Sequence, residues 1–170
     1  AVGTVGSAVY LLDESGSRMW KKDLPHFKRD ACVAYITPAD LSGDGNRALI
    51  VGSENWHQYA FDAHGNEIWA FEILHASTAG IGVDLDGDGR DEAIAGSDYY
   101  SWRAVRPDGA QLWDYRPIGP RTNCILAGDV TGSGKPLVIF GGADGYVHAV
   151  DALGKRQWVY NAADEITGMA

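Results

Sequence analysis

Apolar and polar residues alternate in short runs along this chain, and glycine turns separate the runs. Residues 8–13 and 146–151 show the alternation most plainly. The turns that follow such runs lie at residues 15–17, 64–66, 108–110 and 153–155. Alternation with a period of two, bounded by glycine turns, is typical of β-strands in hairpins. No long apolar segment has the 3.6-residue period of a helix, so we expect an all-β protein with almost no helix.

The pattern repeats about every 45 residues, which is a period typical of repeat architectures. One tryptophan follows each of the four glycine turns, at Trp20, Trp69, Trp113 and Trp158. One full period contains four expected strands, over residues 79–83, 92–97, 102–106 and 111–115. Four short antiparallel strands in about 40–50 residues form one blade of a β-propeller. Because every blade repeats the tryptophan, we expect these four residues to pack between blades.

We therefore expect one β-propeller domain over residues 1–170, with four blades of four antiparallel strands. The blades are assigned to residues 1–24 with 165–170, 31–73, 79–117 and 123–161. Residues 1–24 lack the first strand of a blade, and residues 165–170 match such a strand. Unpaired strand edges favour association. We expect a homodimer that exchanges these strands to give an eight-bladed ring, with a fragment of a larger propeller or a closed four-bladed ring as alternatives.

One turn, residues 84–92, has carboxylates at its first, third, fifth and ninth positions, with glycines between them. Ca²⁺ takes about six to eight oxygen ligands, and glycine permits the tight curl that brings alternate carboxylates together. The expected ligands are the side chains of Asp84, Asp86, Asp88 and Glu92 and the carbonyl of Arg90. The alternative is a simple hairpin turn with Asp as a turn former, but that leaves four neighbouring carboxylates without a neutralising cation.

Two related turns keep the glycines and the first Asp but lack the closing acid, because Ala48 and Leu137 stand in its place. In the turn at residues 40–46, a calcium site and a plain turn are equally compatible with the sequence. Its candidate ligands are Asp40, Ser42, Asp44 and Asn46. The turn at residues 129–135 is not expected to bind calcium.

The Asp-x-Asp-Gly-Asp-Gly loop that leads into a strand resembles the FG-GAP or VCBS repeat of calcium-loop propellers, including those of integrin α-subunits. Residues 140–143, Phe-Gly-Gly-Ala, resemble the motif behind the first name. Residues 145–154 with Trp158, and their counterparts at residues 7–20, also resemble the PQQ-like propeller repeat. The resemblance covers nearly the whole chain and implies a propeller with calcium loops. It implies no single function, since both repeat types occur in enzymes, receptors and lectins.

Composition narrows the class of partner and the location. A net charge of −9 disfavours nucleic acid, and no apolar run is long enough to predict a membrane span. Cys32 and Cys124 lack metal-ligand spacing, so we expect free thiols on inner strands, with a disulfide as the alternative. Calcium sites of this kind favour an extracellular or periplasmic location, where calcium is millimolar.

Antiparallel strands place the calcium loops on one face of the propeller and the less regular loops on the opposite face. The opposite face is rich in Trp, Tyr, His and Arg, which are residue types that hold sugars, flat ligands and protein partners. The candidate ligand-binding residues are His26, Arg29, Trp56, His57, Tyr99, Tyr100 and Arg121. Packing between blades is the alternative role for the aromatic residues of this face, and we favour packing for Trp102.

The sequence contains no familiar catalytic motif, such as Gly-x-Ser-x-Gly or His-Glu-x-x-His. We therefore name no catalytic residue and expect a calcium-stabilised binding or interaction module for a glycan or a protein. The alternative is a carbohydrate-active enzyme, such as a polysaccharide lyase on a calcium-loop propeller. In that case basic and tyrosine side chains of the opposite face would neutralise a uronate and move a proton.

Overall fold

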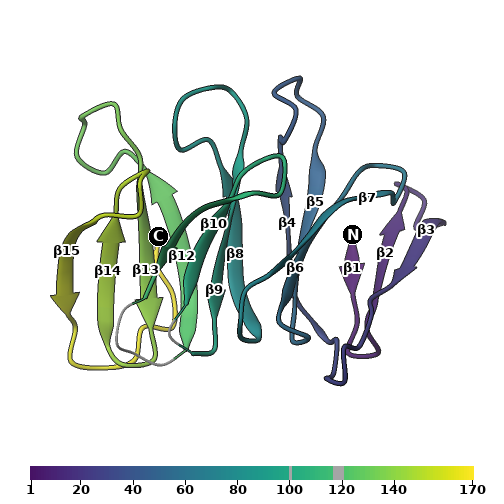
Figure 1. Ribbon diagram of the computed structural model, residues 1–170, viewed down its shortest axis with the longest axis horizontal. Coiled ribbons are helices and arrows are strands. Elements are labelled where there is room, and N and C mark those ends of the chain that lie inside the picture. The colour runs from purple at the N-terminus through teal and green to yellow at the C-terminus, as the bar shows by residue number, and fades with distance from the viewer. Residues whose placement is uncertain (100, 117–120) are drawn as a thin grey trace.

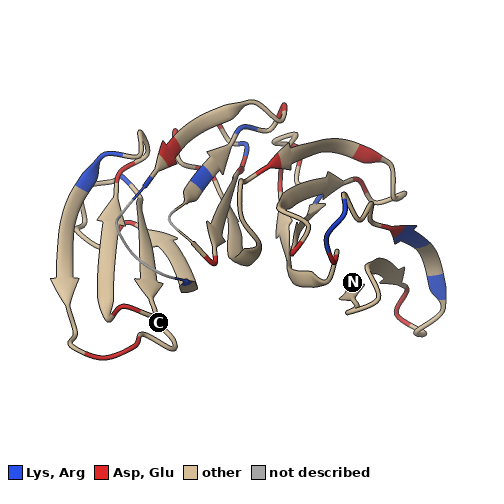
Figure 2. Cartoon of the chain, turned by 60° about the horizontal axis from the view of Figure 1, so that its bottom comes forward, with Lys and Arg blue, Asp and Glu red and all other residues tan. Residues whose placement is uncertain are grey.

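The computed structural model describes residues 1–99, 101–116 and 121–170, and the described residues contain strands but no helix. Four antiparallel sheets follow one another along the chain and form an arc (Figures 1 and 2). The first sheet has three strands, and each of the other three has four. This arrangement confirms the expected all-β class and the four-stranded antiparallel blades.

Each sheet is a simple meander in which consecutive strands pair antiparallel. The first sheet contains β1 (Val2–Gly3), β2 (Ala8–Leu12) and β3 (Arg18–Asp23). The second contains β4 (Val33–Ala39), β5 (Ala48–Ser53), β6 (His57–Phe61) and β7 (Glu67–Glu72). The third contains β8 (Ser77–Val83), β9 (Glu92–Ser97), β10 (Trp102–Val105) and β11 (Gln111–Tyr115). The fourth contains β12 (Thr122–Gly128), β13 (Leu137–Gly142), β14 (Tyr146–Val150) and β15 (Arg156–Asn161).

A glycine turn joins the last two strands of every sheet, as the sequence predicts. In the second sheet the side chain of Asp62 accepts hydrogen bonds from the backbone N–H groups of His64 and Asn66, both at 2.8 Å. Gly65 has a φ of 81°, in the left-handed region that glycine enters without steric cost. The turn is therefore determined by local residues, which explains why it could be located in the sequence.

Three tryptophans reach from their own sheet to the glycine turn of the next sheet. The indole N–H groups of Trp20, Trp69 and Trp113 donate to the carbonyls of Ala63 at 3.0 Å, Pro107 at 3.1 Å and Ala152 at 3.1 Å. A Cβ added to the glycine of each receiving turn, Gly65, Gly109 or Gly154, would lie within 2.9 Å of the tryptophan. We call this arrangement the Trp–turn contact. It confirms the expected packing role for these three tryptophans.

The apolar core lies between neighbouring sheets. Its largest cluster joins Ile94, Trp102 and Trp113 of the third sheet to Phe140 and Val150 of the fourth. The rings of Trp102 and Phe140 stack with centroids 4.0 Å apart, so Trp102 has the packing role that we favoured. Because apolar burial provides most of the stability of such a fold, each sheet depends on the one beside it.

The inner strands β4, β8 and β12 contact one another along the arc. Cys124 lies on β12 and Cys32 lies just before β4, and both are free, half-buried thiols. In the part of the chain that is described, no helix is long and apolar enough to cross a membrane.

Candidate functional site

The loops lie on two faces, as expected from the strand directions. The loops between β4 and β5, between β8 and β9 and between β12 and β13 extend from the upper edge of the molecule in Figure 1. The loops between β3 and β4, between β5 and β6 and between β7 and β8 lie at the lower edge. We call these the loop face and the opposite face.

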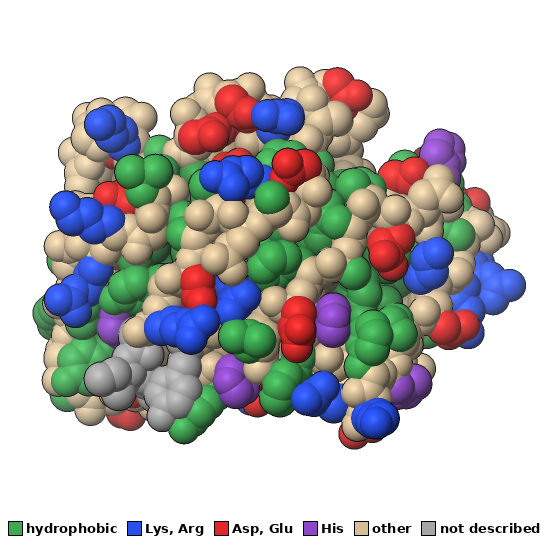
Figure 3. Space-filling view, viewed as in Figure 1, with side chains coloured by type: hydrophobic (Ala, Val, Ile, Leu, Met, Phe, Trp, Pro, Cys, Tyr) green, Lys and Arg blue, Asp and Glu red, His purple; other side chains and the backbone are tan. Residues whose placement is uncertain are grey.

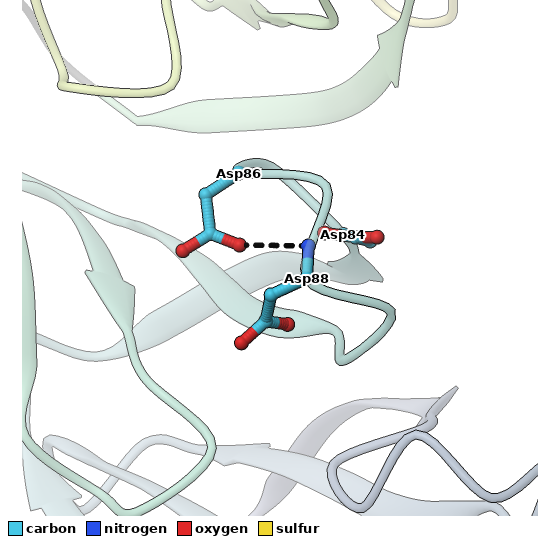
Figure 4. A group of neighbouring side chains, drawn as sticks. All are labelled: Asp84, Asp86 and Asp88. Atoms are coloured by element: carbon cyan, nitrogen blue, oxygen red, sulfur yellow. Dashed lines mark hydrogen bonds between the residues drawn. The ribbon is translucent and has the colours of Figure 1, made fainter.

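The central turn on the loop face gathers three carboxylates (Figure 4). Oxygen atoms of Asp84, Asp86 and Asp88 lie within 4.8 Å of one another. The carboxylate of Asp84 accepts backbone N–H groups of Gly87 at 2.7 Å and Gly89 at 3.0 Å. Both glycines have positive φ, at 81° and 87°. The backbone therefore curls around Asp84 and presents the other two carboxylates to the same region.

Glu92, the closing acid of the turn, is buried at the start of β9. Its Oε2 accepts the backbone N–H of Leu85 at 2.9 Å. Burial, and then the three neighbouring aspartates, raises the pKa of Glu92 to about 7. None of the ion pairs found among residues 1–99, 101–116 and 121–170 includes Glu92. A set of oxygen donors with excess negative charge fits a hard divalent cation.

Arg90 neutralises part of the negative charge at the outer side of this turn. Its guanidinium lies 2.6 Å from Oδ2 of Asp88, and this interaction lowers the pKa of Asp88. Both side chains are substantially exposed, so water screens the pair. The pair leaves Asp84, Asp86 and the buried Glu92 without a basic partner among the described ion pairs.

The other two turns also satisfy their carboxylates with local donors, but they contain fewer acids. In the first turn Asp40 accepts backbone N–H groups of Gly43 and Gly45 at 2.8 and 2.7 Å, and Asp44 accepts Ser42 Oγ and Asn46 Nδ2 at 2.5 and 3.0 Å. In the third turn Asp129 accepts the N–H groups of Ser133 and Gly134 at 3.0 and 2.6 Å. Across the described ranges, the only cluster of three such acidic side chains is the central one.

Asp91 has a role that the sequence did not indicate. Its carboxylate accepts the backbone N–H of Asp40 at 2.7 Å and Nη1 of Arg47 at 2.9 Å, while its own N–H donates to the carbonyl of Asp40 at 2.7 Å. These bonds join the central turn to the first turn, which belongs to the preceding sheet. A cation held by the central turn would therefore also stabilise the contact between the two sheets.

On the opposite face, four side chains from four different loops form a continuous row. The guanidinium carbon of Arg29 lies 3.6 Å from the ring centroid of Trp56. Trp56 contacts His75 with centroids 5.1 Å apart, and His75 contacts Tyr99 edge to face at 5.3 Å. We call Arg29, Trp56, His75 and Tyr99 the aromatic row. Histidine, basic and apolar side chains lie along this lower edge of the surface in Figure 3.

The remaining candidate ligand-binding residues divide into three groups. His57 stacks on Phe27 beside the row, with centroids 4.5 Å apart, and His26 is exposed in the same loop as Phe27. Arg121 is exposed just before β12, in the loop that leads to the fourth sheet, whereas Arg29 precedes the second sheet. Tyr100 lies outside the described residues. Phe27 and His75 were not candidates, although both occupy loops that sequence reasoning assigned to this face.

No protein-family model matches the chain, and no curated protein matches it. Three solved structures are similar over most of its length. BamB from Moraxella catarrhalis is 22% identical, covering 92% of this chain and 44% of its own, with a TM-score of 0.68. BBS1N in complex with ARL6DN is 14% identical, and the match covers 98% of this chain and 47% of BBS1N, with a TM-score of 0.71. The V. cholerae biofilm matrix protein Bap1 is 19% identical, covering 94% and 25%, with a TM-score of 0.70. The chain thus spans less than half of each of these three proteins, and the likeness shows that its fold is that of a β-propeller.

Proposed function

We propose that this chain is a calcium-stabilised β-propeller that binds a glycan through the aromatic row on its opposite face. The observation that carries the proposal is the continuity of Arg29, Trp56, His75 and Tyr99 across four loops. Rigid aromatic side chains provide a large contact area with few rotatable bonds. A row held by the strands of two sheets can therefore bind a flat ligand without first being ordered.

Trp56 shares a turn conformation with its equivalents in other sheets. Trp56 has a φ of 72°, and Gly145 of the fourth sheet and Ser7 of the first hold the same place with φ of 79° and 66°. A side chain in this left-handed region costs roughly 1–2 kcal/mol. Residues in such conformations cluster at functional sites, and Trp56 is the one of these three that has a large ring to offer a ligand.

Charge favours an anionic glycan. The whole chain has a net charge of −9, whereas in the loop that contributes Arg29 the other exposed titratable residues are His26 and Lys28 together with Asp30, so basic side chains are in excess there. A local basic group on an acidic protein attracts a negatively charged ligand and repels other acidic proteins. Uronate-containing polysaccharides combine this charge with the flat sugar surfaces that aromatic rings contact.

The calcium part of the proposal assigns the ion to Asp84, Asp86 and Asp88 with the buried Glu92 and the Arg90 carbonyl, in a turn similar to FG-GAP and VCBS loops. When bound, the ion neutralises the excess charge of this cluster. Its role is structural because the cluster lies on the face away from the aromatic row. Calcium loops of this kind suit an extracellular or periplasmic location, where calcium is millimolar. One of the similar structures is that of a biofilm matrix protein.

A glycan array with pectic and other uronate polymers tests the proposal. We expect binding by the unaltered chain and at least a tenfold loss in Trp56→Ala. Tyr146→Ala is the matched control, since it removes another exposed aromatic ring that lies outside the row. Equal binding by both variants would contradict the row as the binding surface. Release of unsaturated products from any polymer would instead support the lyase alternative, and capture of a protein ligand alone would refute the glycan assignment.

A further inference from the structure

The loop between β3 and β4 lies on the turn between β5 and β6 through two ring contacts. Phe27 of the loop stacks on His57 of the turn with centroids 4.5 Å apart. The guanidinium of Arg29, two residues further along the loop, lies over the ring of Trp56. The place of Arg29 in the aromatic row therefore depends on how the loop is held against the turn.

The shape of this loop needs support from outside. Phe27 and Lys28 have consecutive positive φ values, of 45° and 63°. The N–H of Arg29 donates to the carbonyl of His26 at 2.7 Å, which closes a tight turn. Because side chains other than glycine are strained in the left-handed region, such a conformation persists only where the surrounding structure holds it.

Asn55, a fully buried residue of the turn, supplies support of this kind. Its Nδ2 donates to the carbonyl of Pro25 in the loop and to the hydroxyl of Tyr59, both at 2.6 Å. Its Oδ1 accepts the N–H of His57 at 3.1 Å. One side-chain amide therefore fixes the loop and the turn relative to each other.

The equivalent residues of other sheets show what the amide adds. The strand registers place Asp144 of the fourth sheet and Gly6 of the first at the position of Asn55. Asp144 makes the same contact within its turn, since its Oδ1 accepts the N–H of Tyr146 at 3.0 Å. A carboxylate has no N–H group, and glycine has no side chain, so neither can donate to a neighbouring loop. The turn itself does not require an amide, and the amide adds the donor that binds the loop.

Arg29 brings a positive charge to one end of the row. Among the ion pairs of residues 1–99, 101–116 and 121–170, none includes Arg29. The N–H groups of a guanidinium lie in its plane, so stacking on Trp56 leaves them at the edge of the pair. An arginine held in this way can bind a carboxylate through two parallel hydrogen bonds.

We infer that Arg29 binds the carboxylate of the glycan and so distinguishes an acidic from a neutral sugar, and that Asn55 is the positioning residue that holds Arg29 for this task. The inference rests on the proposed function and adds the residue that recognises the charge. A cation that is ordered before binding loses less conformational entropy when the ligand arrives. Without the Asn55 amide, the loop keeps its residues but loses the fixed position of Arg29.

Nuclear magnetic resonance tests the positioning without any ligand. In the wild type, the ring current of Trp56 should shift the side-chain protons of Arg29 upfield. Asn55→Asp keeps the acceptor that the turn uses, and Asn55→Gly adds no charge; both should return these protons towards unshifted values. Asn66→Asp is the matched control, because it makes the same chemical change at an exposed residue of the same sheet, and it should leave the shift unchanged. Asn55 variants that are folded by circular dichroism and keep the upfield shift would refute the positioning role.

Titration calorimetry with an oligogalacturonate and with its carboxyl-reduced form tests the recognition of charge. We expect the wild type to bind the acidic form about tenfold more tightly or better. Arg29→Gln, at an exposed position, and Asn55→Gly should each bring the ratio of the two affinities close to one. Lys155→Gln, which removes an exposed positive charge from the fourth sheet, should leave the ratio unchanged.

The outcomes separate this inference from the proposed function. Binding of the acidic form with its preference retained in Arg29→Gln would overturn the inference and leave the glycan site standing. Equal binding of the two forms by the wild type would do the same. A wild type that binds neither form, nor any other glycan, would overturn the proposed function and with it the role of Arg29, whereas the resonance shifts would still decide whether Asn55 positions Arg29.

Discussion

Replacing two of the clustered carboxylates, as Asp86→Asn with Asp88→Asn, tests the calcium site most directly. The wild-type turn gathers three carboxylates within 4.8 Å, so binding of Ca²⁺ is expected to favour the folded state. With a dissociation constant of about 0.1 mM, within the range of extracellular calcium modules, about 5 mM free Ca²⁺ stabilises the fold by about 2.3 kcal/mol. Each kcal/mol shifts the melting temperature of a chain of this size by about 2–4 °C. We therefore expect calcium to raise it by about 5–9 °C.

The assay is thermal unfolding in EGTA and in calcium, for the wild type, the double variant and the control Asp108→Asn. Asp108 is an exposed turn residue of the same sheet that accepts the N–H of Ala110, so the control should keep the full calcium shift. The double variant should lose most of it. In EGTA the double variant should be at least as stable as the wild type, because it has fewer mutually repelling charges. A wild-type melting temperature that is the same in EGTA and calcium would refute the site.

Three further predictions concern the core and its titratable groups. Trp113→Ala should lower the free energy of unfolding by about 3–5 kcal/mol in urea denaturation, because it removes a buried ring and the hydrogen bond to Ala152. Tyr35→Phe should cost about 1–3 kcal/mol in the same measurement, since it removes the partner that buried Gln58 Nε2 donates to at 2.9 Å. Burial lowers the pKa of His148, so the folded state keeps the ring neutral while the unfolded chain takes up a proton below about pH 6.5. His148 alone should therefore lower stability as the pH drops from 7 towards 5, whereas the raised pKa of Glu92 acts in the opposite direction in calcium-free buffer. Relative to the wild type, His148→Gln should remove a loss of stability between pH 7 and pH 5; the same stability difference in both proteins would contradict this cause. The titratable groups that face the His148 ring are Tyr115, Asp144, Tyr146 and Arg156, and the ring of Trp102 also contacts it.

Local chemistry explains what the sequence could predict. The glycine turns, the alternating strands and the central carboxylate turn each depend on residues only a few positions apart. Asp62 and Gly65, for example, determine their turn together through short-range hydrogen bonds and a left-handed φ. The repeat then indicated that the tryptophans pack between sheets. It could not identify the carbonyls that receive their N–H groups, because these lie in the following blade.

Contacts between distant segments were beyond sequence reasoning. Asp91 sits in a run of acids and looks like part of the calcium turn, but the fold places it against Arg47, 44 residues away in the chain. The face assignment grouped Arg29 with Trp56 and Tyr99, and these side chains lie in one row. It also included Arg121, because strand direction specifies the face of a propeller but not the position around its axis. The link through His75 required the three-dimensional packing.

The Trp–turn contact has a direction, because the first three sheets each give a tryptophan to the sheet that follows. The stability of one sheet should therefore depend mainly on its contacts with the sheets beside it, as in a one-dimensional array. In such an array the backbone amides of the second and third sheets, covered on both sides, should exchange with deuterium more slowly than those of an uncovered terminal sheet. Weakening the link at Trp69 should split one cooperative unfolding transition into two. The same small contact that builds the arc would then determine how many parts of it melt as one unit.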